Sequence, residues 1–250
     1  MAYRKTPVTC TIIAFNEADR VARAIASVAG IADEVIVVDS GSTEGTIALC
    51  QSLGARVLHN DWVGFGPQKR FAEDAAANDW ILNLDADEWL SEELREELKA
   101  LLAQEIPIAR CFRIKTVIVY PNREMPAPFA HFHNYIRLYN RNTARFSPSL
   151  THDVVAPTND CAQLNADILH KSYRNAAHVL VKTISYFQLQ IVEMKMPRRI
   201  AFVRMVFEFP FQFIKYYIAR RHIFGGWNGF VYSSVLAMGR WMRIFILNGW

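Results

Sequence analysis

The stretch Trp80–Leu90, WILNLDADEWL, places three carboxylates directly after a short apolar run. The apolar part has the length and composition of a buried strand. Asp85 and Asp87 alternate, so in an extended backbone their side chains point to the same face. Two carboxylates this close repel each other unless a cation lies between them. Because oxygen ligands favour hard divalent ions, the pattern predicts a site for Mg2+ or Mn2+.

A purely structural interpretation of these acids is also open. Ser91, Glu92 and Glu93 come next in the chain. A serine N-cap with acidic residues in the first turn is typical of a helix start. The acids could therefore belong to a strand that leads into a helix, and the residues upstream have to decide.

Those upstream residues alternate between strand-like and helix-like segments. The expected strands are Val8–Ala14, Glu34–Asp39, Arg56–Leu58 and Trp80–Leu84, and the expected helices are Ala18–Ala29, Thr46–Leu53 and Gln68–Ala77. This alternation predicts a parallel sheet covered by helices on both faces, an α/β fold. Ligands of such sheets bind beyond the carboxyl ends of the strands. Asn16, Glu17, Asp39 and the Asp85/Asp87 pair all follow strands directly, so one crevice should collect them.

The common phosphate-binding loops are missing from this sequence. No GxGxxG follows the first strand and no GxxxxGK[ST] occurs anywhere, which disfavours dinucleotide-binding and P-loop folds. A phosphatase of the haloacid-dehalogenase type would need its DxD on the first strand, whereas here it follows the fourth.

Four ordered motifs resemble the inverting glycosyltransferases of family 2, which have a GT-A fold. They are TIIAFNEADR, DEVIVVDSGSTEGT, WVGFGPQKRFA and DWILNLDADEWLS. More narrowly, the chain is similar to the bacterial branch that contains lipopolysaccharide-core β-1,4-glucosyltransferases. The likeness is close over residues 8–105 and looser to about residue 175. Glu44 departs from the Asp that is usual in the STDGT turn, and no role is assigned to it.

The resemblance implies a UDP-sugar donor. It implies that Asp39 accepts from the uracil ring, that Glu17 takes ribose hydroxyls, and that Lys69 lies near the base or diphosphate. Asp85 and Asp87 would hold the metal and diphosphate. These residue types suit acceptor, cationic and metal-binding roles. Two alternatives stay open, since Asp39 could cap a turn and Lys69 could be an exposed lysine at a helix start.

The second half of the chain holds a candidate base and a further candidate metal ligand. The resemblance implies that Asp153, in the sequence Thr-His-Asp, is the general base that removes a proton from the acceptor hydroxyl. His170 resembles a family position near the diphosphate and is a candidate metal ligand. Asp153 could instead cap a turn, and His170 could be structural.

The segment between the two expected strands Ala109–Tyr120 and Asn134–Tyr139 reads as a loop, Pro121–His133, rich in proline. His131 and His133 alternate, but with no third ligand they are assigned to the loop. Arg137 on the second strand could face the site or pair with a core carboxylate.

Charge is distributed unevenly along the chain. Residues 171–250 contain 12 Lys and Arg against 2 acidic residues and so carry +10, whereas the first 170 residues, with 16 against 22, carry −6. The aromatic and cationic mixture in Phe202–Ile223 predicts docking on an anionic membrane surface without crossing it. The longest uncharged run there, His222–Gly239, contains four glycines and is poorly suited to span a bilayer. A helical cap on the catalytic domain or a dimer interface is the alternative.

Hydrophobic content of 52% allows a substantial core in one large domain with an appendage. The expected divisions are 1–105, a nucleotide-sugar-binding half, 106–175, an acceptor-side half, and 176–250, a basic and aromatic helical region. The cysteines Cys10, Cys50, Cys111 and Cys161 form no CxxC pair, which argues against a zinc site or disulfide framework and fits a reducing compartment. The N-terminal MAYRKTP shows no signal-peptide pattern.

The resemblance implies transfer of a hexose, with glucose expected, from a UDP-sugar to a saccharide hydroxyl of a membrane glycolipid such as lipopolysaccharide core. The enzyme is expected to be cytoplasmic and peripheral on the inner face of the cytoplasmic membrane, with no nucleic-acid partner. Transfer to polyprenyl phosphate or a peptide, metal-dependent phosphate hydrolysis, and a catalytically silent sugar-nucleotide-binding protein are the alternatives.

Overall fold

The structure is a computed structural model that describes residues 6–103, 109–150, 154–156, 160–191 and 198–248. The chain divides into two compact units. Met1–Val117 and His133–His170 form the first, here called the sheet unit, and Ile118–Phe132 with Lys171–Trp250 form the second, here called the helical unit. The predicted segment 106–175 is therefore distributed between the two.

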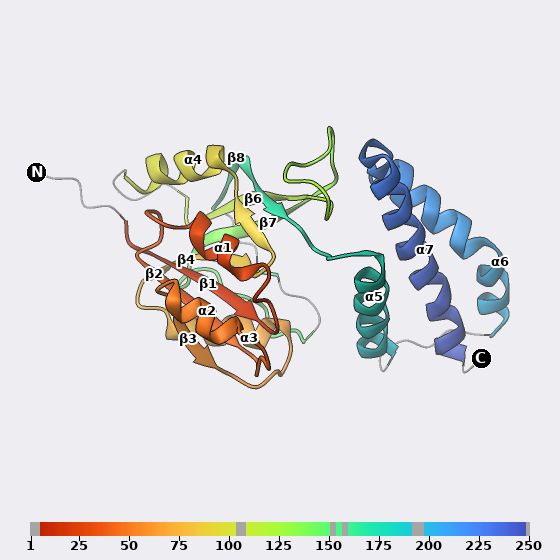
Figure 1. Ribbon diagram of the computed structural model, residues 1–250, viewed down its shortest axis with the longest axis horizontal. Helices are drawn as coiled ribbons and strands as arrows, with labels where there is room; N and C mark the ends of the chain where they lie inside the picture. Colours follow the sequence, from red (N-terminus) through yellow and green to blue (C-terminus); the bar gives the residue numbers. More distant parts are fainter. Residues whose placement is uncertain (1–5, 104–108, 151–153, 157–159, 192–197, 249–250) are drawn as a thin grey trace, which may run out of the picture. The chain divides into compact units, whose positions relative to one another are not determined.

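A mixed β-sheet forms the framework of the sheet unit (Figure 1). Its described strands are β1 (Val8–Ala14), β2 (Glu34–Asp39), β3 (Arg56–His59), β4 (Trp80–Asp85), β5 (Glu88–Leu90), β6 (Cys111–Ile118), β7 (Phe132–Asn140) and β8 (Cys161–His170), in the order β3-β2-β1-β4-β7-β6-β8-β5. β1 pairs in parallel with β2 and β4, and β2 with β3. Ala14 lies opposite Asp39 and Ile13 opposite Asp85, so the ends of these strands share one edge, as predicted.

The helices between these strands agree with the predicted alternation. They are α1 (Val21–Ser27), α2 (Thr46–Ser52), α3 (Phe65–Ala75) and α4 (Glu92–Leu102). Ser91 is the N-cap of α4, and its hydroxyl accepts from the Leu94 N–H at 3.2 Å. Glu92 and Glu93 occupy the first turn, where negative charge stabilises the helix dipole. The helix-start interpretation therefore holds for Ser91–Glu93, while Asp85 and Asp87 precede it.

Two antiparallel pairings in the sheet were not predicted. β5 and β8 pair antiparallel, with Glu88 opposite His170, and β4 pairs antiparallel with β7. The three-residue β5 follows β4 after only two residues, Ala86 and Asp87. This arrangement brings the acids of the DADE sequence beside a strand that lies far away in the sequence.

The cysteine expectation needs a correction. Cys111 in β6 and Cys161 in β8 form a disulfide, with Cα atoms 4.6 Å apart, whereas Cys10 and Cys50 are free and buried. Sequence spacing alone missed this pair because 50 residues separate the two cysteines. β6 and β8 are neighbours in the sheet, and this pairing brings the two cysteines together.

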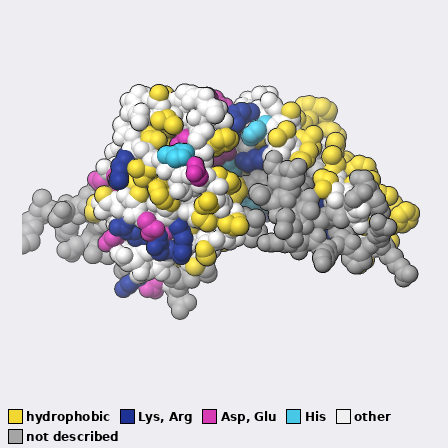
Figure 2. Space-filling model, turned by 90° about the horizontal axis from the view of Figure 1, so that it is seen from below, with side chains coloured by type: hydrophobic (Ala, Val, Ile, Leu, Met, Phe, Trp, Pro, Cys, Tyr) yellow, Lys and Arg dark blue, Asp and Glu magenta, His cyan; other side chains and the backbone are white. Residues whose placement is uncertain are grey.

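Over its described residues, the helical unit contains three α-helices and two short helical turns. They are α5 (Ala176–Ile191), α6 (Arg198–Ile214), the π-helix η1 (Lys215–Ala219), the 3-10 helix η2 (His222–Gly225) and α7 (Trp227–Asn248). α7 packs against both α5 and α6, and the Trp241 indole donates to the Met205 carbonyl at 2.7 Å. Figure 2 shows hydrophobic side chains gathered on the surface of this unit. Within the described ranges, no helix is both long and apolar enough to cross a membrane.

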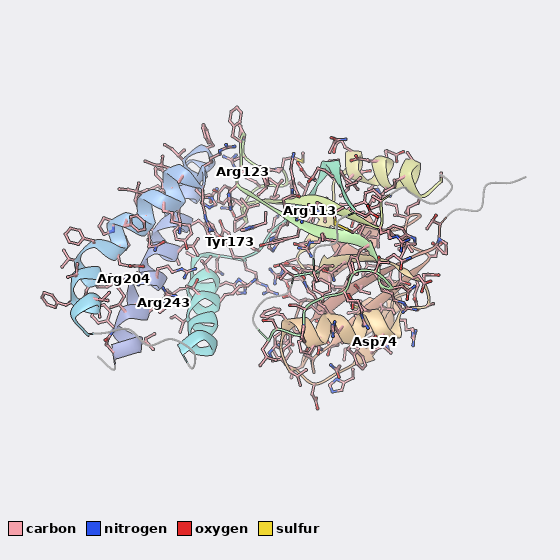
Figure 3. The ribbon with its side chains drawn as sticks, turned by 180° about the vertical axis from the view of Figure 1, so that it is seen from behind. Asp74, Arg113, Arg123, Tyr173, Arg204 and Arg243 are labelled. Atoms are coloured by element: carbon pink, nitrogen blue, oxygen red, sulfur yellow. A yellow bond between two sulfur atoms is a disulfide. The ribbon has the colours of Figure 1, made fainter. Side chains whose placement is uncertain are left out.

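The loop that connects β6 to β7 belongs to the helical unit. Tyr120 lies 2.9 Å from Nδ1 of the buried His222, and Tyr173, labelled in Figure 3, stacks on Tyr232 with ring centres 4.6 Å apart. Ala127 in the same loop is buried in this cluster. The predicted loop Pro121–His133 is thus held by tertiary contacts with the helices.

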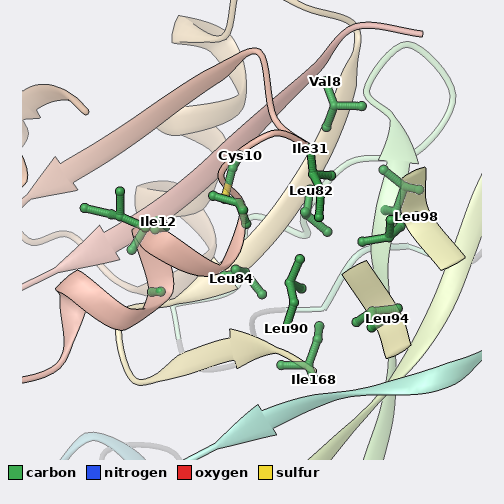
Figure 4. Packing of buried hydrophobic residues seen from close by; sticks show 14 of the residues in the cluster. Val8, Cys10, Ile12, Ile31, Leu82, Leu84, Leu90, Leu94, Leu98 and Ile168 are labelled. Atoms are coloured by element: carbon green, nitrogen blue, oxygen red, sulfur yellow. The ribbon is translucent and has the colours of Figure 1, made fainter. Parts of the chain in front are cut away.

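The main core of the sheet unit lies between the sheet and the helices α1 and α4 (Figure 4). Cys10, Ile12, Leu82 and Leu84 of the central strands are fully buried there. Leu94, Leu98 and Leu102 of α4 follow at four-residue spacing and face the same core. A rigid framework therefore carries the strand ends at which the candidate site residues lie.

Candidate functional site

The loops after β1 and β2 are joined by hydrogen bonds. Asn16 adopts a left-handed backbone with φ of 55°, its N–H donates to the Ser42 hydroxyl at 2.8 Å, and its side-chain oxygen accepts from the Thr43 N–H at 2.9 Å. Asparagine tolerates this conformation better than most residues. The Ala18 N–H donates to Glu44 at 2.9 Å, which identifies a structural contact for the glutamate that departs from the family pattern.

Asp39 lies at the end of β2 and is fully buried. Its Oδ1 accepts from the N–H groups of Gly41 at 2.9 Å and Ser42 at 2.7 Å, and its Oδ2 accepts from the Ser42 hydroxyl. The carboxylate therefore caps the turn after β2, which is the alternative that the sequence left open. Contact with a uracil ring stays a prediction.

Glu17 forms a bidentate ion pair with Arg20. The arginine Nε and NH2 groups donate to the two carboxylate oxygens at 2.7 and 2.6 Å, and Arg20 NH1 also lies 3.3 Å from Oδ2 of Asp87. Arg20 thereby connects the loop after β1 to the DADE sequence. The sequence analysis assigned no role to Arg20, although its three-residue spacing from Glu17 is compatible with such a pair.

Lys69 lies in the second turn of α3 and is buried, in contrast to the exposed alternative. Its Nζ is 2.8 Å from Oδ1 of Asp85 and 5.0 Å from the ring centre of Phe146. Arg137 lies 3.7 Å from the other oxygen of Asp85. Burial alone would raise the pKa of Asp85, but the two cations lower it to about 2. Asp85, predicted as a metal ligand, therefore has its carboxylate between two cationic side chains.

Glu88 and Arg137 form a buried ion pair behind the site. Arg137 NH2 lies 2.6 Å from Oε1 of Glu88, and its NH1 donates to the Asn83 side chain at 3.0 Å. The other oxygen of Glu88 accepts from the Asp85 N–H at 3.0 Å. Burial raises the pKa of the Glu88 carboxyl, and the charge of Arg137 opposes that rise. The sequence analysis assigned no role to Glu88. Of the two alternatives open for Arg137, facing the site or pairing with a core carboxylate, the structure shows the ion pair.

Asp87 and His170 face each other across the antiparallel pair β5–β8. Nε2 of His170 is 3.3 Å from Oδ1 of Asp87, and its Nδ1 is 3.9 Å from Glu88. The structure therefore brings together two of the three predicted metal ligands. No cluster of three or more His, Cys, Asp and Glu side chains suited to a metal occurs among the described residues. Mg2+ is commonly held through one or two carboxylates together with substrate phosphates, so Asp87 fits such an ion, and His170 lies beside it.

Asp153 lies outside the described residues, but the chain on both sides of it is anchored. Phe146 and Val155 form an antiparallel bridge, and the Ser147 N–H donates to the Val154 carbonyl at 2.9 Å. Arg145 binds Glu73 at 2.9 Å and Asp74 of α3, which Figure 3 labels. The described residues on the two sides of Asp153 therefore pair with each other, and those that precede it are tied to α3.

The start of α3 also contacts this segment closely. The N–H groups of Phe65 and Gly66 donate to the carbonyls of Leu150 and Ser149, each at 3.1 Å. A Cβ on Gly66 would lie 2.2 Å from the Ser147 carbonyl oxygen, so only glycine allows this approach. Lys69 is one turn further along the same helix. The helix that supplies a cation to Asp85 thus also positions the chain that leads to Asp153.

The carboxyl edge of the parallel strands therefore carries alternating acidic and basic side chains, at the place where α/β enzymes bind their ligands. Comparison with known proteins identifies the family. The sequence model of glycosyl transferase family 2 matches residues 9–172. An uncharacterized glycosyltransferase of Rickettsia felis is 38% identical over 250 residues, which cover 95% of this chain and 88% of the relative. This chain belongs to glycosyltransferase family 2.

Two further similarities concern a named relative and the fold. The lipopolysaccharide core biosynthesis glycosyltransferase LpsC of Rhizobium meliloti is 31% identical over 240 residues, which cover 91% of this chain and 86% of LpsC. The solved structure of S. aureus TarS residues 1–349, in complex with UDP-GlcNAc, is similar with a TM-score of 0.50 and 16% identity, covering 76% of this chain and 68% of TarS. The predicted GT-A fold and the family resemblance are confirmed, and the protein is a glycosyltransferase.

Proposed function

We propose that this enzyme transfers a hexose, with glucose expected, from a UDP-sugar to a saccharide hydroxyl of a membrane glycolipid such as lipopolysaccharide core, with inversion at the anomeric carbon. The observation that carries the proposal is the pair of contacts Lys69–Asp85 and Asp87–His170 at the carboxyl edge of the sheet. The similarity to LpsC favours a lipopolysaccharide-type acceptor over polyprenyl phosphate or a peptide.

The donor would lie along the loops after β1, β2 and β4. Lys69 supplies a cation near the diphosphate, and Asp85 orients the Lys69 ammonium group. Glu17 would take the ribose hydroxyls, and Asp39 shapes the turn that borders the base. A carboxylate has about four acceptor sites, of which Asp39 uses three in the turn. Because Asp39 is fully buried, its contact with the uracil N–H would require this turn to shift when the donor binds.

Asp87 and His170 would hold Mg2+ or Mn2+. When bound, such an ion neutralises charge that develops on the departing diphosphate. Arg20 lies next to Oδ2 of Asp87, and His170 lies next to Oδ1. Arg20 therefore orients the Asp87 carboxylate. Arg20 would thereby hold the Asp87 carboxylate so that its Oδ1 atom is directed toward the metal ion.

Asp153 would remove the proton from the acceptor hydroxyl as that oxygen attacks the anomeric carbon. Inversion requires the hydroxyl and the leaving diphosphate to be on opposite sides of the sugar ring. The contacts of the Ser147–Leu150 segment with the start of α3 support this assignment, because they bring the chain next to Asp153 close to the helix that carries Lys69.

The test is product analysis with purified full-length protein, a panel of UDP- and GDP-sugars, and lipid extract from bacterial membranes. Transfer to a glycolipid, with an inverted linkage by NMR, is the expected result. Asp87→Asn should lower turnover by about 10²–10³-fold, and Asp153→Asn by about 10²–10⁴-fold with donor binding retained. Phosphate release that needs no acceptor, or full activity in EDTA, would contradict the proposal.

We also propose that the enzyme acts as a peripheral protein at the cytoplasmic face of the membrane, where a nucleotide sugar and a lipid-held acceptor can meet. The charge of +10 on residues 171–250 supports an anionic membrane surface as its partner.

A further inference from the structure

α6 and η1 carry an uninterrupted apolar stripe on their exposed side. Its members recur every three or four residues, and each is more than half exposed: Ile200, Val203, Phe207, Phe211, Ile214 and Ile218. Phe202 and Val206 widen the stripe and are at least 60% exposed. A helix of a soluble protein normally turns such a face toward the core, so this exposed stripe indicates contact with an apolar partner outside the chain.

The opposite side of the same segment is packed within the helical unit. Ala201 and Tyr216 are buried, and so is Glu208, the acidic residue described in α6. Arg204, labelled in Figure 3, donates twice to Glu208 at 2.8 Å, and Gln212 donates to it at 3.0 Å. The negative charge of this helix is therefore neutralised on its inner side, and the exposed side has no acidic residue.

A second group of exposed aromatic side chains adjoins the end of α6. Phe129 contacts Phe224 with ring centres 5.3 Å apart, and Trp227 stacks on Phe230 at 5.2 Å. Phe230 also meets Phe213 of α6 at 5.5 Å, so the two groups are connected. Trp227 is 75% exposed and Phe129 is 70% exposed. We call the stripe and this aromatic group together the apolar face; Figure 2 shows hydrophobic side chains of the helical unit from one side.

Exposed cationic residues accompany the apolar face. Lys215 follows α6 directly, Arg221 precedes η2, and Arg123 lies in the loop that also carries Phe129. Phenylalanine and tryptophan rings beside basic side chains suit the headgroup boundary of a bilayer, where rings enter the acyl region and charges meet anionic lipid. A second copy of this chain would instead bring a surface of the same positive charge against these residues.

We propose that the apolar face inserts into the headgroup boundary of an anionic lipid bilayer, with α6 lying in the plane of the membrane. This deepens the proposed function, since it rests on a membrane-held acceptor and identifies the surface that brings the enzyme to it. The unbroken stripe over α6 and η1 provides the apolar area, and the basic residues provide attraction that depends on salt.

The test measures flotation of the full-length protein with vesicles of phosphatidylcholine alone or mixed with phosphatidylglycerol, without any sugar donor. Truncation is unsuitable because the loop Ile118–Phe132 packs within the helical unit. The test variant Phe207→Glu/Phe211→Glu should partition at least about tenfold more weakly, because charged groups replace two exposed rings that would enter the bilayer. The matched control, Gln51→Glu/Leu53→Glu, adds the same charge to exposed positions near the end of α2 and should bind like the unchanged protein.

Trp227 provides a second readout. Brominated lipids should quench its fluorescence on anionic vesicles, and Trp227→Phe should lose that part of the quenching. Failure of the unchanged protein to bind anionic vesicles at low salt, or equal binding by the Phe207→Glu/Phe211→Glu variant, would overturn the inference. So would a dimer in sedimentation analysis in which Trp227 fluorescence is protected from an aqueous quencher without lipid. Transfer to a detergent-solubilised acceptor, measured in parallel, separates failure of this surface from failure of the proposed reaction.

Discussion

At the scale of single residues, the site depends on charges that are buried in pairs. Glu88 and Arg137 lie 2.6 Å apart, and both are nearly inaccessible to solvent. Forming such a pair contributes little net stability, because both groups lose their hydration. Removing one partner costs far more, because it leaves the other charge uncompensated. Glu88 also accepts from the Asp85 N–H, so the pair positions the backbone that presents Asp85 and Asp87.

Glu88→Gln keeps the shape of the side chain and removes its charge. We expect the free energy of unfolding to fall by about 3 kcal/mol and kcat to fall at least about tenfold, because Asp85 and His170 lose a positioning contact. Thermal unfolding and steady-state kinetics measure both effects. Glu96→Gln, at an exposed glutamate that pairs with Lys99, is the matched control and should leave both quantities nearly unchanged. Unchanged stability and kcat in Glu88→Gln would show that Glu88 has no positioning role.

At the scale of elements, α3 connects two parts of the site. Its first turn holds the carbonyls of Ser149 and Leu150, and its second turn carries Lys69. Gly64, with φ of 123°, begins the helix in a conformation that glycine favours, and Gly66 allows the close approach. The helix therefore starts three residues earlier than the sequence pattern predicted, because a tertiary contact replaces the usual side-chain cap.

Gly66→Ala should displace the segment that leads to Asp153. The new Cβ would meet the Ser147 carbonyl oxygen at 2.2 Å, and the backbone has to move to relieve this contact. A displacement of about 1 Å can lower a rate by about 10²-fold, so we expect a loss of this size in kcat. Isothermal titration should show UDP binding retained. Gly45→Ala, where nothing lies within 4 Å of the new Cβ, is the control; equal kcat in both variants would remove the segment from the mechanism.

At the scale of the whole molecule, a buried histidine makes the stability of the helical unit depend on pH. His222 is buried in the helical unit, and burial, His131 and Arg220 together lower its pKa from 6.5 to about 3. Its other neighbours, Tyr120 and Tyr232, are neutral in this range because burial raises the pKa of each hydroxyl. The folded helical unit thus keeps His222 neutral under conditions in which an unfolded chain would protonate it.

Stability should therefore fall on acidification. Between pH 6.5 and about 3 the unfolded state binds one more proton at this position than the folded state, so each pH unit costs up to about 1.4 kcal/mol. Above pH 6.5 both states are neutral there and the effect vanishes. Thermal unfolding followed by circular dichroism should show this slope, and His222→Gln should flatten it. If the stability of His222→Gln falls with decreasing pH as steeply as that of the unchanged protein, the pH dependence belongs to other groups.

Local sequence determined the strands β1, β2 and β4 and the capped start of α4, because alternation, apolar runs and N-cap chemistry depend on neighbours along the chain. It also predicted that Glu17, Asp39, Asp85 and Asp87 share one edge, because parallel strands align their carboxyl ends. The family followed from four ordered motifs, and the model match over residues 9–172 confirmed it.

Tertiary structure alone decided which charges pair. Lys69 is buried against Asp85, Arg137 against Glu88, and Cys111 is bonded to Cys161, because strands and helices that are distant in the sequence meet in the sheet unit. The antiparallel pairing of β5 with β8 sets His170 beside Asp87, and a three-residue strand such as β5 has too little sequence pattern to reveal its partner. Pairing across such distances depends on the whole fold, and so local sequence carries little information about it.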